Sequence, residues 1–80
     1  MNLPDNNTIE KVNALANSLA DKQGLSFNPV IKDTYCSLIP STDKEVNMDL
    51  VRTIRKKFKG IFIWINETSS NYSIDYALKY

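Results

Sequence analysis

The chain of 80 residues has no histidine, one cysteine and two glycines. Without histidine and with a single cysteine, it cannot supply a Cys/His zinc site or a Ser-His-Asp triad. Two glycines are also too few for a glycine-rich phosphate-binding loop. These absences remove the common routes to catalysis, so we expect a protein that is not an enzyme and that uses no catalytic residue, cofactor or metal.

Long apolar runs are missing as well. The longest one, at residues 61–65, is far shorter than a membrane-spanning helix, and residues 1–6 lack the basic and apolar regions of a signal peptide. The lone Cys36 cannot form an internal disulfide, and without a histidine to activate it we expect a small buried thiol rather than a nucleophile. A cytoplasmic protein without membrane contact is therefore the expectation.

The remaining composition is that of an ordinary folded domain. Hydrophobic residues make up 42% of the chain and charged residues 24%, which argues against intrinsic disorder. A chain of 80 residues has room for only one hydrophobic core. We therefore predict a single domain over residues 1–80.

The N-terminal part predicts an amphipathic helix over residues 8–23. Asn7 would cap its start, and Gly24 would end it in the left-handed conformation that glycine adopts without strain. Its apolar residues recur at the spacing of one helix face: Ile9, Val12, Leu15, Ala16, Leu19 and Ala20. This face should pack on the core.

A second helix is predicted over residues 43–59. Residues 42–45 have the pattern of a capping box, and Gly60 follows the last basic residue as a helix terminator. The apolar residues expected on its buried face are Leu50, Val51, Ile54 and Phe58.

The other segments have strand patterns. Residues 61–65 are apolar on both faces, which favours a central strand, and residues 72–80 alternate apolar with polar. Turn-forming residues between them predict an antiparallel hairpin that pairs residues 61–66 with residues 71–79. Earlier in the chain, residues 26–31 and 35–39 indicate two strands, and Pro29 suggests a sheet edge because proline donates no ladder hydrogen bond.

Together these elements predict an α+β fold. We expect one four-stranded, mainly antiparallel sheet with both helices packed on one face, in the order αββαββ, or αβαββ if residues 25–39 form one strand.

Positive charge is concentrated in the second half of the chain. Seven acidic and four basic residues give residues 1–49 a net charge of −3, whereas six basic and two acidic residues give residues 50–80 a net charge of +4. The cations expected on the exposed face of the second helix are Arg52, Arg55, Lys56 and Lys59. They could bind nucleic-acid phosphates, or they could simply be solvated and complement the helix dipole.

Aromatic residues define a second candidate surface. Phe62 and Trp64 lie on one face of their strand and the isoleucines on the other, so helices can cover only one of the two sets. The other set must be covered within the fold, bind a partner protein, or stack on nucleic-acid bases. Tyr72, Tyr76 and Tyr80 alternate along the last strand and should form its core face, with their hydroxyl groups at the rim.

These surfaces lead to two hypotheses on function. The first is a small non-enzymatic protein-binding module, an inhibitor or modulator of the kind that mobile elements such as phages encode. Phe62, Trp64, Tyr72 and Tyr76 are its candidate contact residues. A partner protein is expected, and it could be a second copy of the chain. The alternative is a nucleic-acid-binding domain that uses the basic second helix.

Overall fold

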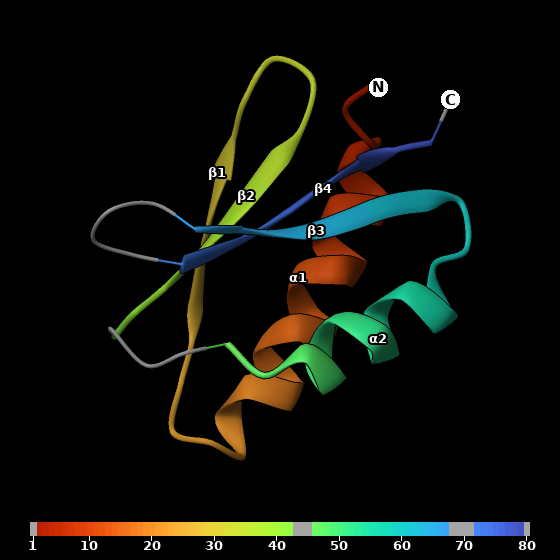
Figure 1. Cartoon of the computed structure of the whole chain (residues 1–80). Helices are drawn as coiled ribbons and strands as arrows, with labels where there is room; N and C mark the ends of the chain where they lie inside the picture. Colours follow the sequence, from red (N-terminus) through yellow and green to blue (C-terminus); the bar gives the residue numbers. More distant parts are fainter. Residues whose placement is uncertain (1, 43–45, 68–71, 80) are drawn as a thin grey trace.

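The computed structural model describes residues 2–42, 46–67 and 72–79. Its elements are α1 (Asn6–Asp21), β1 (Phe27–Ile31), β2 (Cys36–Pro40), α2 (Met48–Lys57), β3 (Ile61–Glu67) and β4 (Tyr72–Leu78). The expected α+β fold and the order αββαββ are confirmed, with residues 25–39 forming two strands. Figure 1 shows both helices on the same side of the sheet.

The sheet has the strand order β1-β2-β4-β3, and every neighbouring pair is antiparallel. The last hairpin pairs Ile61 with Leu78 and continues to Glu67 opposite Tyr72, as predicted. The strand that contains Pro29 lies at one edge, also as predicted.

The position of β3 contradicts the sequence-based prediction. This strand lies at the other edge of the sheet, and the polar-patterned β4 is central instead. The reason is that β4 is buried on both faces: Ile74 and Tyr76 face the helices, while Asp75 is held on the opposite face by hydrogen bonds from neighbouring serines. Apolar residues on both faces of β3 therefore did not indicate a central strand.

The first helix forms close to the predicted residues, but it starts two residues earlier. The carboxylate of Asp5, rather than Asn7, caps it by accepting a hydrogen bond of 2.8 Å from the backbone N–H of Thr8. Gly24 follows the helix with a φ of 70°, as expected for a left-handed terminator. Its buried residues all belong to the predicted apolar face: Ile9, Val12, Ala16 and Ala20.

The second helix is shorter than predicted. It begins at Met48, and Asn47 caps it by accepting a hydrogen bond of 2.9 Å from the N–H of Asp49. The preceding Val46 is buried in the core. Residues 43–45 of the predicted capping box lie outside the described residues.

The end of α2 also differs from the prediction. Ile54 is fully buried as expected, but Phe58 is the C-cap and is only partly buried. Gly60 does not have a positive φ, so it is not a left-handed terminator. It lies in the turn before β3, where its carbonyl accepts a hydrogen bond from the N–H of Lys79.

One hydrophobic core lies between the helices and the sheet, and its buried side chains come from both helices and all four strands. Tyr76 is its largest fully buried side chain, and its hydroxyl donates to Asn13 Oδ1 on α1 at 2.8 Å. Cys36 lies opposite Tyr76 on β2 and is buried as predicted. Within the described residues, neither helix is long and apolar enough to cross a bilayer.

Candidate binding surface

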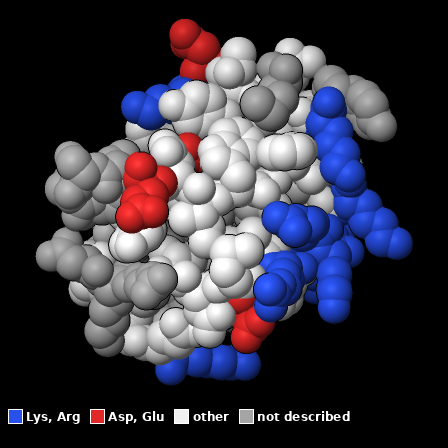
Figure 2. Space-filling view, in the orientation of Figure 1, with Lys and Arg blue, Asp and Glu red and all other residues white. Residues whose placement is uncertain are grey.

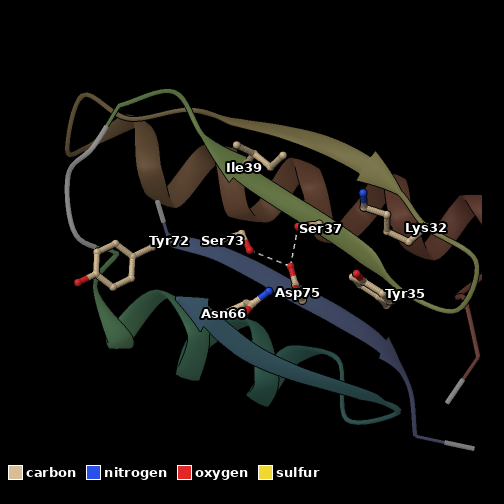
Figure 3. A pocket seen from close by; sticks show the side chains of 8 residues that line it. All are labelled: Lys32, Tyr35, Ser37, Ile39, Asn66, Tyr72, Ser73 and Asp75. Atoms are coloured by element: carbon tan, nitrogen blue, oxygen red, sulfur yellow. Dashed lines mark hydrogen bonds between the residues drawn. The ribbon is translucent and has the colours of Figure 1, made fainter. Parts of the chain in front are cut away.

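The face of the sheet opposite the helices, here called the open face, is the main candidate surface. Side chains alternate along a strand, so the residues next to Tyr76 and Ile63 in sequence point away from the helices. The strand register brings the following residues together there: Val30, Ser37, Ile39, Phe62, Trp64, Asn66, Ser73, Asp75 and Ala77. Figure 3 views this face with both helices behind the sheet.

Three aromatic rings form a row on the open face. The ring centroids of Phe62 and Trp64 lie 5.6 Å apart, and those of Trp64 and Tyr35 lie 6.1 Å apart, with tilted planes. These separations fall in the range of favourable aromatic pairs. Phe62 remains 51% exposed, and the other two rings are half-buried. We call these three residues the aromatic row.

The helices cover the isoleucines of β3, not its aromatic residues. Ile61 and Ile63 are almost completely buried against the helices. Phe62 and Trp64 therefore form the set that the helices leave uncovered, which was the question the sequence left open. Tyr35 was not predicted as part of this surface, because its neighbour Trp64 is 29 positions away in the chain and only the strand register brings them together.

A polar cluster lies beside the aromatic row. Asp75 is only 2% exposed, and its Oδ1 atom accepts hydrogen bonds from Ser37 Oγ at 2.6 Å and from Ser73 Oγ at 3.1 Å. The sequence placed Asp75 on the wet face of its strand. Its burial could not be predicted, because it depends on Trp64 and Ser37 being its neighbours on the two flanking strands.

Between these groups the open face contains a hollow of about 260 Å³ (Figure 3). Its lining residues are Lys32, Tyr35, Ser37, Ile39, Asn66, Tyr72, Ser73 and Asp75. Tyr72, a predicted contact residue, is half-buried at this site. In the described part of the chain, no three acidic or cysteine side chains come together in a way that could hold a metal ion.

Tyr76, the other tyrosine proposed as a contact residue, is not on the surface. It is fully buried and points toward α1, because it lies on the helix-facing side of β4. Burial also raises the pKa of its phenol, and the neighbouring Cys36 adds to this. Its role is therefore in the core. Tyr80 lies outside the described residues.

All four predicted cations are exposed, but only Arg52, Arg55 and Lys56 lie on α2; Lys59, expected on the helix, follows its end at Lys57. Arg52 forms an ion pair of 3.2 Å with Asp49, and Arg55 donates to the carbonyl of Ile63 at the edge of β3. Figure 2 shows that basic side chains gather on the side of the molecule formed by α2. We call these four residues the basic face.

One further cation joins this region. Lys79, which follows β4, lines a smaller hollow together with Arg55 and with three residues of β3, including Phe62. The basic side of the molecule therefore reaches one end of the aromatic row.

Comparison with protein-family models, with curated proteins and with solved structures gives no match to this chain, so its function has to be argued from this surface.

Proposed function

We propose that the protein is a protein-binding module and that its contact surface is the open face. The observation that carries this proposal is the aromatic row, which lies on a sheet face that neither helix covers. Tyrosine, tryptophan and phenylalanine are enriched in the buried centres of protein interfaces. A monomer rarely leaves a contiguous apolar patch exposed without a use for it.

The open face also has the rigidity that an interface needs. Phe62 and Trp64 come from a strand paired with β4 along its whole length, and their rings contact each other. Rings held in this way lose little conformational entropy when a partner binds. The neighbouring basic face would contribute differently, because exposed charges at an interface rim increase the rate of association more than the lifetime of the complex.

The test is affinity capture from a lysate of the native host, with nuclease present, followed by binding measurements with the captured protein. Phe62→Ser removes the most exposed ring of the aromatic row. If this ring is an anchor, the dissociation constant should rise by at least about thirtyfold. Ile31→Ser is the matched control, because Ile31 is an equally exposed apolar residue, at 57%, outside the row.

The proposal fails if Phe62→Ser and Ile31→Ser bind the captured partner equally well. It also fails if nuclease removes all captured material.

A second candidate function is nucleic-acid binding, which is favoured by Lys79 and Arg55 lying beside the exposed ring of Phe62. Cations next to an aromatic ring can bind phosphates while a base stacks on the ring. In that case, changing Arg52, Arg55, Lys56 and Lys59 to Gln should abolish binding of a single-stranded oligonucleotide. Wild-type affinity should fall steeply with salt.

An inhibitory role and an origin in a mobile element remain predictions from the small size and the composition. The captured partner would test the inhibitory role, because an inhibitor of a host enzyme should lower the activity of the protein that it binds.

A further inference from the structure

We infer that the hollow of the open face binds an arginine side chain of the partner protein, with Asp75 as the group that recognises its charge. This inference rests on the proposed function, since it names a group that the partner would insert.

One carboxylate oxygen of Asp75, Oδ2, has no hydrogen-bond donor among the described residues. Ser37 and Ser73 both donate to Oδ1, and no described residue donates to Oδ2. Among the described residues, no buried side-chain oxygen lacks both solvent contact and a hydrogen-bond partner. The Oδ2 atom must therefore be reachable from outside, and the hollow that Asp75 lines is the route.

The carboxylate of Asp75 also lacks a positively charged partner among the described residues. Asp75 is 98% removed from solvent, and no described basic group lies within ion-pairing distance of it. A nearly buried carboxylate is stabilised most by a charged donor. Lys32 lines the same hollow, but its side chain lies at the β1 side in Figure 3 and makes no ion pair with Asp75.

The residues that line the hollow suit a guanidinium group in shape and chemistry. The aromatic ring of Tyr35 and the side-chain amide of Asn66 line the hollow beside Asp75, whereas the ring of Tyr72 lies at the far end of the hollow (Figure 3). A guanidinium group is flat, stacks on aromatic rings and carries five N–H donors, so it can contact rings while it donates to several oxygens. A lysine ammonium group could form an ion pair with Asp75, but it is not flat and would not stack on an aromatic ring.

The experiment uses Trp64, the only tryptophan of the chain, as a fluorescent reporter. It lies opposite Asp75 in the sheet, and its ring contacts that of Tyr35. The full chain is titrated with N-acetylarginine amide and, separately, with N-acetylcitrulline amide, which has nearly the same shape without the charge. Ionic strength is kept constant with sodium chloride.

We expect a saturable change with the arginine compound at a dissociation constant on the order of millimolar, as for a ligand this small. The citrulline compound should bind at least about tenfold more weakly, since its neutral urea group can donate to the carboxylate but carries no positive charge to pair with it.

Two variants locate the site. Asp75→Asn keeps the shape and one acceptor oxygen for the serines but removes the charge, and arginine binding should weaken at least about tenfold. Asp33→Asn removes the same charge from an exposed position outside the hollow and should leave binding unchanged. If Asp75→Asn proves unfolded by circular dichroism, Tyr35→Leu tests the same hollow through its wall and should weaken binding severalfold.

Three results would overturn the inference: no saturable change up to about 100 mM arginine compound, equal binding of citrulline, or unchanged binding by Asp75→Asn. None of them affects the proposed function, which depends on capture of a protein through Phe62. Conversely, if Phe62→Ser leaves capture intact while the titration succeeds, the hollow binds arginine but the aromatic row is not the interface.

Discussion

The two faces of the sheet differ in which side chains they bury. On the helix side, Ile63 and Tyr76 are buried, and the hydroxyl group of Tyr76 donates a hydrogen bond to Asn13 on α1. On the open face, Phe62 is half-exposed while Asp75 is buried. The comparison shows that exposure does not follow polarity here. The buried aspartate and the exposed phenylalanine are what distinguish a candidate binding surface from a core.

The largest expected effect is on the helix side of β3. Ile63→Ala should lower the free energy of unfolding by about 2–5 kcal/mol, because it leaves a cavity in the core. This is a large part of what a small domain has. Urea denaturation followed by circular dichroism would measure it. A loss below about 1 kcal/mol would mean that the helices do not pack on this side as described.

A smaller effect is expected from the polar cluster of the open face. Asp75→Ala leaves the hydroxyl groups of Ser37 and Ser73 without their acceptor, so the free energy of unfolding should fall by about 1–3 kcal/mol. The triple variant that also changes both serines to Ala should recover part of this loss, because no hydroxyl group is then left unpaired. If the triple variant is less stable than Asp75→Ala, the hydrogen bonds are not the cause.

Stability should also depend on pH through Cys36, which lies on the helix-facing side of the sheet. Burial raises the pKa of the Cys36 thiol. The unfolded chain therefore loses this proton first, at a pH near 8.5. The stability contribution is complete below that pH and is lost as the pH rises toward the folded-state pKa. Cys36→Ala should show a shallower fall of melting temperature between about pH 8 and 10. An identical slope in both proteins would contradict the prediction.

The smallest effect on stability is expected at the neighbour of Ile63. Phe62→Ala should change the free energy of unfolding by less than about 1 kcal/mol, since the ring is half-exposed and its contacts, which include that with Trp64, lie at the surface. The same denaturation series would measure it. Equal losses for Phe62→Ala and Ile63→Ala would remove the difference between the two faces, and with it the main support for the binding surface.

Several elements could be predicted because short-range patterns decide them. The apolar stripe of α1 and the terminator Gly24 depend on residues a few positions apart, and the last hairpin pairs two strands that are close in sequence. Pro29 indicated an edge strand because proline has no backbone N–H to donate to a neighbouring strand, and this holds whichever strand is the neighbour. Helical spacing accounts for the exposure of Arg52, Arg55 and Lys56, whereas Lys59 lies beyond the end of α2.

Other features could not be predicted from local patterns. The helix α2 starts later than predicted, and the burial of Val46 before it is not determined by its neighbours in sequence. Tyr76 was expected on the core face of β4, and this is correct. Its hydroxyl group was expected at the rim of the core, but α1 packs over it and Asn13 accepts its hydrogen bond. The candidate site gained Tyr35 and Asp75 only through strand pairing.

The sequence by itself determined the α+β class, the two helices and the hairpin, because periodicity and turn chemistry act within about ten residues. It also indicated that one apolar face of β3 would lack helix cover, because both helices were expected on the same face of the sheet. Only the tertiary structure decided that β4 is central and β3 an edge strand. That choice depends on contacts between distant segments, where Ser37 satisfies Asp75 and thereby makes a polar strand stable in the middle of the sheet.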